Sequence, residues 1–230
     1  MENVLKSIFY FYLAYVVLSL LIIIINAAAR SRFHSLIDKF NKEDEKYVDS
    51  YEIVDLVLKD NNVKEEITFK IGDSNYMSAD KSITLTKDLS RRKSVSAIAI
   101  AAHEAGHCVQ HFGDGKDELI KRRENEYNVS MFLMFIGALS PLLCLAFESL
   151  IPMIFGISLM AVVLMKRILY VKVEKEASEL GIKSIVSNNI LEGQDLNHAK
   201  ELLVTAASTY VVSCLSEVAS VMGLMLRVLK

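Results

Sequence analysis

Residues 96–107 read SAIAIAAHEAGH, a run of small apolar residues that ends in the motif His103-Glu104-Ala105-Gly106-His107. The small apolar residues predict a buried helix. Two histidines four positions apart lie on one face of a helix, about 6 Å apart along its axis, so both imidazoles can bind one metal ion. The H-E-x-x-H pattern is typical of zinc hydrolases, in which the glutamate polarises a water molecule. The stretch therefore predicts a Zn²⁺ site with His103 and His107 as ligands and Glu104 as the catalytic base.

The composition narrows the class of protein. The chain has 230 residues, of which 52% are hydrophobic and 23% charged, so apolar and charged residues must be separated along it. The net charge of −2 gives no indication of a nucleic-acid partner. The three cysteines, Cys108, Cys144 and Cys214, are odd in number and widely spaced. This spacing argues against a disulfide framework or a cysteine zinc site and favours a reducing compartment.

The first apolar segment covers residues 7–29, which contain no charged side chain. Its length is sufficient to cross a bilayer. A cleaved signal peptide is the alternative, because residues 27–29 are three alanines. However, the apolar run is too long for a signal peptide, and Arg30 and Arg32 follow it. We therefore expect residues 1–29 to form an uncleaved membrane anchor with its N-terminus outside the cell.

Further apolar segments lie in the second half of the chain. Residues 129–147 and 149–165 are uncharged, and basic residues flank the pair on both outer sides. This pattern predicts a transmembrane hairpin over residues 128–168 with both ends in the cytoplasm, although a buried hairpin of a soluble protein is the alternative. The C-terminal segment 197–230 is also apolar over residues 202–226, and it fits either a fourth membrane helix or an interfacial helix.

The polar portion, residues 30–127, carries the zinc motif and is expected in the cytoplasm. Residues 44–62 predict a short amphipathic helix. Residues 66–70 and 82–86 alternate polar and apolar side chains and have turn residues between them, which predicts a small β-hairpin. The predicted fold class is mainly α and integral to the membrane. It combines a helical zinc-metalloprotease core with this β-hairpin and three to four membrane helices.

A catalytic zinc ion needs a third protein ligand. His111 cannot join His103 and His107, because histidines at these three positions spread over roughly 12 Å of helix axis. His34 and His198 are isolated in the sequence. The third ligand should therefore come from elsewhere in the chain.

A carboxylate from residues 169–196 is the best candidate for that ligand. Residues 173–178 read VEKEAS and follow the predicted hairpin, which returns the chain to the cytoplasm. Glu174 and Glu176 cannot share one helical face. Their spacing alone does not decide between them.

Three blocks of the chain resemble a known family. Residues 94–111 (SVSAIAIAAHEAGHCVQH), 173–178 and 206–211 (AASTYV) resemble, in the same order, the bacterial membrane neutral zinc metallopeptidases of the YugP type. The second block is also similar to the Glu-x-x-Ala-Asp segment of the HtpX and CAAX-prenyl proteases, whose first glutamate binds zinc. The resemblance implies that Glu174 is the third zinc ligand, with Ser178 in place of the aspartate. Tyr210, in the third block, is then a candidate oxyanion donor, with simple packing as the alternative.

These observations predict an enzyme, a membrane-embedded zinc-dependent endopeptidase with a peptide or protein substrate. It would be a multi-pass protein of the cell membrane whose active site faces the cytoplasm. The alternative is a membrane-anchored zinc-binding protein without turnover, such as a scaffold or a chaperone-like factor. The presence of Glu104 in the motif argues against that alternative, because a purely structural zinc site normally fills all four positions with protein ligands. The sequence leaves the substrate, the cleavage specificity and the oligomeric state open.

Overall fold

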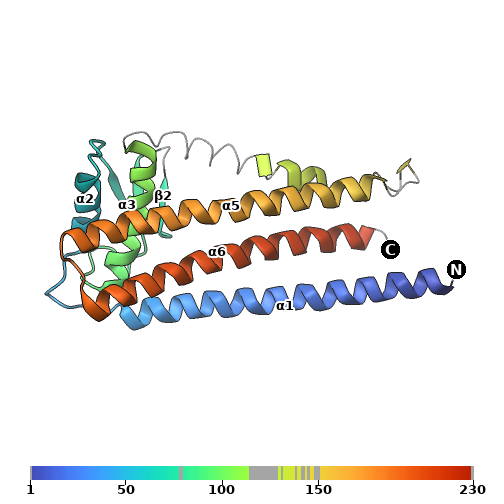
Figure 1. Ribbon diagram of the computed structural model, residues 1–230, viewed down its shortest axis with the longest axis horizontal. Coiled ribbons are helices and arrows are strands. Elements are labelled where there is room, and N and C mark those ends of the chain that lie inside the picture. Colours follow the sequence, from blue (N-terminus) through green and yellow to red (C-terminus); the bar gives the residue numbers. More distant parts are fainter. Residues whose placement is uncertain are drawn as a thin grey trace. The chain divides into compact units, whose positions relative to one another are not determined.

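The computed structural model describes residues 2–77, 80–113 and 151–228, and residues 129–130, 132–137, 139–140, 143 and 146–147 between the last two ranges. The chain is mainly helical with a small sheet. Its elements are α1 (Glu2–Phe40), α2 (Ser50–Asp60), β1 (Thr68–Ile71), β2 (Asn75–Met77), β3 (Ser82–Leu85), α3 (Val95–Phe112), α5 (Ile151–Ser187) and α6 (Gly193–Val228) (Figure 1).

The chain divides into two compact units. The first comprises Met1–Arg30, Asn125–Tyr170 and Thr209–Lys230, and the second comprises Ser31–Glu124 and Val171–Ser208. Within the first half of the predicted membrane hairpin, residues 129–147, thirteen positions are described and are helical, whereas the basic cluster that precedes it, residues 121–123, lies outside the described residues.

Helix α2 of the second unit begins at Ser50 because Asp49 caps it. The Asp49 carboxylate accepts hydrogen bonds from the backbone N–H groups of Tyr51 and Glu52, and the Glu52 side chain accepts one from the Asp49 N–H. This reciprocal capping box satisfies donors that the first helical turn leaves open. The predicted start of this helix at residue 44 is therefore wrong, since residues 44–49 are irregular. The predicted stop is confirmed, because the helix ends at Asp60.

The predicted β-hairpin is wrong in its strand pairing. Strand β3 lies in the centre of a three-stranded sheet, with β1 parallel to it on one side and β2 antiparallel on the other. The reason is that residues 75–77, which lie between the two predicted strands and of which only Asn75 was predicted as a turn residue, form a strand of their own. This extra strand reverses the chain before it reaches β3, so β1 and β3 run in the same direction.

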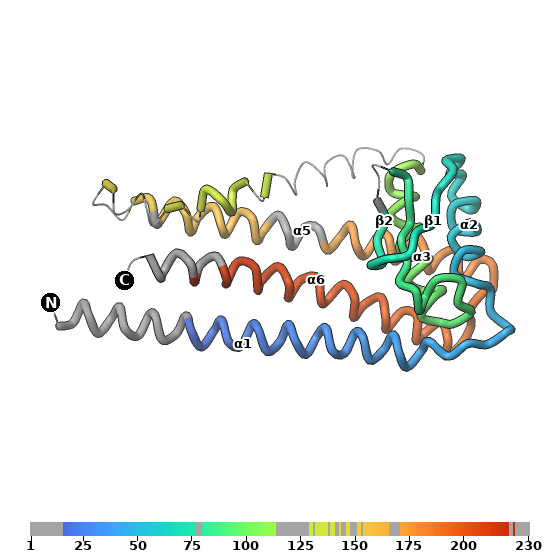
Figure 2. Tube along the Cα trace, turned by 180° about the vertical axis from the view of Figure 1, so that it is seen from behind, coloured from blue at the N-terminus to red at the C-terminus, as the bar shows by residue number. Residues whose placement is uncertain are grey.

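Helix α3 is the buried helix of the second unit. The Ser94 hydroxyl caps it by accepting from the Ala97 N–H, and Gly113 follows its last residue. Ile98 is fully buried within the core formed by α3, α2 and the sheet. Figure 2 shows these elements side by side. The Ser96 hydroxyl donates to the Ile37 carbonyl of α1, which ties the start of α3 to this part of α1.

Small residues bring α3 into close contact with α5. A Cβ atom added at Gly106 would lie 2.1 Å from the Ala177 carbonyl oxygen, and one at Gly181 would lie 2.5 Å from the Ala102 carbonyl oxygen. Neither position can hold a larger residue without moving backbone. The glycine of the zinc motif therefore sets the distance between the two helices (Figure 1).

The first unit exposes large apolar side chains. Ile24 of α1 is 62% exposed, and Ile154 of α5 is 65% exposed. Among the described residues, two helical stretches have the length and apolar composition to cross a membrane, Val16–Phe40 and Gly193–Ser220, and a shorter apolar stretch covers Ile154–Met165. The sequence had predicted three to four membrane helices, and that number stays a prediction.

Candidate metal centre

Helices α3 and α5 bring together the three residues predicted as metal ligands. The rings of His103 and His107 meet edge to face, with centroids 4.7 Å apart. The Glu174 Oε2 atom lies 3.3 Å from Nε2 of His103 and 3.2 Å from Nε2 of His107. One ligand atom from each residue lies within 4.8 Å of the other two. No other such group of histidine, cysteine, aspartate or glutamate is found in the part of the chain that the structure describes.

The orientation of His103 follows from Ser178. The Ser178 hydroxyl donates to the Glu174 backbone carbonyl at 3.0 Å, so its oxygen is left to accept. Nδ1 of His103 lies 3.0 Å from that oxygen and must therefore carry the proton. The neutral imidazole then has its lone pair on Nε2, the atom that faces Glu174.

The orientation of His107 follows from Gln110 by the same reasoning. The Gln110 amide nitrogen donates to the Val173 carbonyl at 2.9 Å and to the Glu176 carboxylate at 3.3 Å. Its amide oxygen therefore faces Nδ1 of His107, at 3.0 Å, and accepts from it. Both histidines thus turn an unprotonated Nε2 toward the same space, which is how histidines bind zinc.

The electrostatics of the centre favour a cation. Burial opposes ionisation of Glu174, but a proton on Nε2 of His103 or His107 would outweigh it by hydrogen bonding to the carboxylate and would hold the pKa of Glu174 well below its usual range. In the tautomers assigned above, a bound cation would take the place of that proton. An ionised carboxylate and two imidazole lone pairs are all acceptors, so a positive charge between them would stabilise the arrangement. Two histidines and one glutamate are a ligand set that zinc accepts, with a fourth position left for water. The residues present therefore fit a zinc ion.

Glu104 lies on α3 next to the first histidine and is only 7% exposed. Among the described residues it has no hydrogen-bond or ion-pair partner. A buried carboxylate without a protein partner is unfavourable unless it serves a solvent molecule or a ligand. This setting suits a group that exchanges a proton with water at the metal site.

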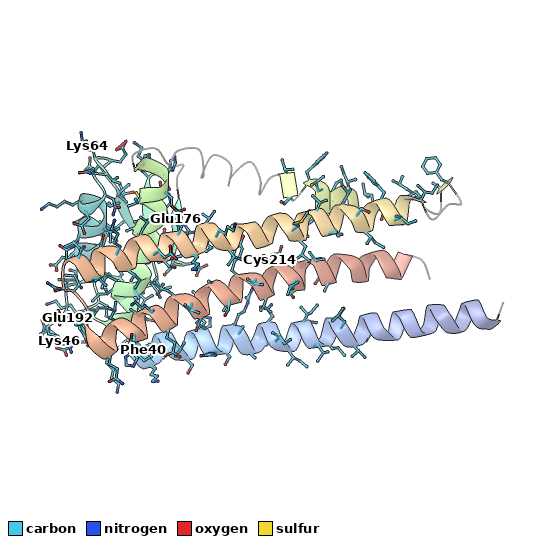
Figure 3. All side chains as sticks on the ribbon, in the orientation of Figure 1. Phe40, Lys46, Lys64, Glu176, Glu192 and Cys214 are labelled. Carbon is cyan, nitrogen blue, oxygen red and sulfur yellow. The ribbon has the colours of Figure 1, made fainter. Side chains whose placement is uncertain are left out.

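The other candidate ligands of the second unit do not belong to this cluster. Glu176 contacts Gln110 and lies on α5, as Figure 3 shows. His111 has its Nδ1 atom 3.1 Å from the Tyr76 hydroxyl, and His198 stacks on Phe40 with centroids 4.2 Å apart. Tyr210 belongs to α6 in the first unit, and its role as an oxyanion donor stays a prediction.

The structure adds residues whose importance the sequence did not show. Gly106 and Gly181 permit the close approach of the two helices, and Ser178 orients His103. The positions of Ser178 and Gly181 four and seven residues after Glu174 on α5 were the available signal, but their meaning depends on the partner helix α3. Tyr76 of β2, which pairs with His111, is a further hydroxyl on the α3 side of the sheet.

A helix with the H-E-x-x-H pattern, completed by a glutamate from a second helix, has the ligand set of thermolysin-type zinc peptidases. The family model described as "Putative neutral zinc metallopeptidase" matches residues 15–229, and the chain belongs to this family. The chain is 28% identical over 144 residues to the protein named "Putative membrane protease YugP" of Bacillus subtilis (strain 168). That alignment covers 61% of this chain and 62% of the relative, so the chain spans about three-fifths of the relative's length. No solved structure matches.

The family comparison confirms the predicted membership in the YugP-type group. The similarity of residues 173–178 to the HtpX and CAAX-prenyl proteases stays a prediction.

Proposed function

We propose that this protein is a zinc-dependent endopeptidase embedded in the cell membrane, with its active site on the cytoplasmic side. The observation that carries the proposal is the convergence of His103, His107 and Glu174 from two helices onto one space. The family description and the name of the Bacillus relative support the same class of activity.

The residues suggest a division of roles. His103, His107 and Glu174 would hold the zinc ion, which supplies a Lewis acid that polarises a peptide carbonyl and lowers the pKa of water. Glu104 takes the proton from the attacking water and then delivers it to the amine that leaves. Ser178 and Gln110 keep the two imidazoles in the tautomer that binds metal. Glu104 follows His103 on α3 and is only 7% exposed, which keeps its carboxylate out of bulk solvent.

The membrane location is supported by the exposed apolar side chains of the first unit. Val16–Phe40 and Gly193–Ser220 have the required length and composition, and the uncharged segments 129–147 and 149–165 add the proposed hairpin. A soluble domain rarely exposes so much contiguous apolar surface. Basic residues next to these segments favour a cytoplasmic location for residues 30–127 and 169–196.

Hydrolysis of an unstructured protein such as casein tests the activity. Purified wild-type protein should contain about one zinc per chain and cleave casein. Glu104→Gln should keep its zinc but cleave on the order of a hundredfold more slowly or worse, since it removes only the proton acceptor. Glu66→Gln, at an exposed glutamate outside the centre, is the matched control and should cleave normally.

Two results would contradict the proposal. Unchanged cleavage by Glu104→Gln would remove this residue from the chemistry. Stoichiometric zinc without cleavage of any protein substrate by the wild type would favour the alternative, a zinc-binding protein without turnover.

Thiol labelling in intact cells tests the topology. After the native cysteines are replaced, cysteines at Ser31 and Glu192 should resist a membrane-impermeant reagent, because both sites are expected in the cytoplasm. Glu192 is exposed and labelled in Figure 3, so lack of reaction would not reflect burial. A cysteine at Glu148, between the two apolar segments, should react. Labelling at Ser31 or Glu192 would contradict the proposed orientation.

A further inference from the structure

A groove of about 730 Å³ lies between α5 and α6 in the second unit. Its walls include Val171, Ile182 and Val186 of α5 and Leu203 and Val204 of α6. Leu203 is buried at 4% exposure, whereas Val204 is 71% exposed and Val186 is 46% exposed. The groove thus has a buried apolar floor and apolar sides that are open, and its volume is that of a ligand site rather than a packing defect.

The hydroxyl groups in these walls have protein partners already. The Ser178 hydroxyl donates to the Glu174 carbonyl and accepts from His103, and the Ser187 hydroxyl donates to the Ser184 carbonyl. An occupant therefore meets no hydroxyl in the groove that lacks a protein partner. Hydrocarbon suits such a surface better than a polar ligand or a peptide backbone does, because backbone groups buried there would lose their hydrogen bonds to water.

Long charged side chains contribute their apolar stems to the walls of the groove, and they are predominantly basic. Lys175, Lys183 and Lys200 contribute to the lining, together with one acidic residue, Glu179. Glu179 lies 3.7 Å from Lys175 and neutralises part of its charge. Lys183 and Lys200 have no ion-pair partner within the described part of the chain. The groove therefore combines an apolar interior with an excess positive charge.

We propose that this groove binds an anionic phospholipid, with an acyl chain along the apolar floor and the phosphate group near Lys183 and Lys200. The apolar floor and the basic side chains match the two parts of such a molecule. In the sequence, Val171 follows the apolar stretch 149–165 after a few residues, and Lys200 lies just before the apolar stretch 202–226 of α6. Basic residues next to the cytoplasmic ends of membrane helices commonly bind acidic lipids. The proposal rests on the membrane location proposed above, but it does not depend on proteolysis.

Photo-crosslinking from within the groove tests the proposal and identifies the occupant. The full chain carries p-benzoylphenylalanine at Val204 and is reconstituted in phosphatidylcholine nanodiscs with a minor share of phosphatidylglycerol. Irradiation followed by intact-mass and peptide analysis should give lipid adducts. Phosphatidylglycerol should be enriched in these adducts severalfold over its share of the bilayer.

A pair of charge variants tests the role of the lysines. Lys183→Gln combined with Lys200→Gln should abolish the enrichment, so that phosphatidylglycerol appears in the adducts in proportion to its share of the bilayer, since each lysine near a membrane surface adds about a factor of five in affinity. Lys59→Gln combined with Lys64→Gln is the matched control. Both of these lysines are exposed, neither lines the groove, and Figure 3 labels Lys64. This control should leave the enrichment unchanged.

Other outcomes would overturn the proposal. If the chain with intact lysines gave phosphatidylglycerol adducts only in proportion to the share of this lipid in the bilayer, the lysines would not select an anionic group. A crosslink to residues 114–127 would make this segment the occupant, and a covalent dimer would make the groove an interface between two copies. The absence of any adduct would show that no lipid enters. Zinc content and casein cleavage are measured separately, so failure here is distinguishable from failure of the proposed activity.

Discussion

The two units of this protein differ in whether their large apolar side chains are buried or exposed. In the second unit, Ile53, Ile83 and Ile98 are completely buried, and the polar residues inside it include the helix cap Ser94 and three residues of the metal centre, Glu104, His107 and Gln110. In the first unit, Ile24 and Ile154 are more than half exposed on helices that otherwise carry few polar groups. The second unit buries its apolar side chains in a core, as a domain that folds in water does. The first unit exposes apolar side chains on its surface, which is typical of proteins that contact an apolar environment.

The buried core of the second unit explains why the metal centre lies there and not in the first unit. The metal centre requires each imidazole to be held by a hydrogen bond, and all of its residues come from the second unit. The first unit provides apolar surface, which supports the proposed anchoring. If this division is correct, zinc binding depends on the second unit alone, and substitutions in the two units have different consequences.

The largest expected effect is the loss of zinc from a histidine variant. His107→Ala should reduce the zinc content to a small fraction of one ion per chain, because two remaining ligands hold zinc poorly. His111→Ala removes the same side chain one turn further along α3 and should leave zinc in place. Elemental analysis of the purified proteins measures this, and equal zinc contents in the two variants would contradict the assignment.

The two glutamates of α5 should also differ strongly. Glu174→Gln should weaken zinc affinity by on the order of a hundredfold or more, since it replaces a ligand charge. Glu176→Gln keeps an oxygen that can accept from the Gln110 amide, so it should cost about tenfold at most. Competition with a chelator gives both affinities. A larger loss of zinc affinity in Glu176→Gln than in Glu174→Gln would contradict the assignment of Glu174 as the ligand.

Much of the metal centre could be predicted from local sequence patterns. The histidine pair is set by the 3.6-residue period of α3, and the caps at Ser94 and Gly113 follow from residue types that suit helix ends. The choice of Glu174 over Glu176 needed the family resemblance, because helical spacing separates their faces without saying which one meets α3.

The sheet and the helix contact could not be predicted from the same patterns. Strand β2 has three residues, too few to show an alternating pattern, and its pairing with β3 is a long-range property. Gly106 and Gly181 matter only because a carbonyl of the partner helix lies against each of them. Such contacts depend on the crossing of two helices, which no single segment encodes.

Packing against the metal helix can be compared with packing on the surface of the first unit. Gly106→Ala should destabilise the second unit by about 2–4 kcal/mol, because the new methyl group overlaps the Ala177 carbonyl and must push α5 away. Ile24→Ala, at a 62% exposed position of α1, should cost less than about 1 kcal/mol, since it leaves no cavity. Chemical denaturation with a probe in each unit measures both. A larger loss from Ile24→Ala would contradict the division.

Removal of a histidine support should have a smaller effect on zinc than removal of a ligand. Gln110→Ala deletes the acceptor that holds Nδ1 of His107, so zinc affinity should fall by about 10- to 100-fold while the fold is kept. Ser187→Ala, at an exposed serine of α5, is the control and should bind zinc normally. Gln110→Glu combined with Glu176→Gln keeps an acceptor for Nδ1 of His107 without setting two carboxylates against each other, and it should recover part of the affinity, which a purely structural role of Gln110 would not explain.

The smallest expected effect concerns a surface contact of the second unit, in which the Tyr47 hydroxyl donates to the Asp195 carboxylate at 2.6 Å. This hydrogen bond lowers the pKa of Asp195, slight burial opposes the shift, and Lys46 adds to it. A carboxyl whose pKa is lower in the folded state stabilises the fold above its unfolded pKa of about 3.9, and that contribution disappears as the pH falls through the folded pKa.

Tyr47→Phe should therefore cost at most about 1 kcal/mol near neutral pH, and the difference from the wild type should shrink as the pH falls toward roughly 2. Unfolding followed at several pH values measures this, with Asp195→Asn as the partner variant, in which Tyr47→Phe should have little further effect. A cost that is independent of pH would mean that Tyr47 acts through packing. The expected loss of stability is small because Asp195 remains about one-third exposed, so water also solvates its charge. The contrast with the buried supports of His103 and His107 follows from that exposure, since the same kind of hydrogen bond contributes more where water is excluded.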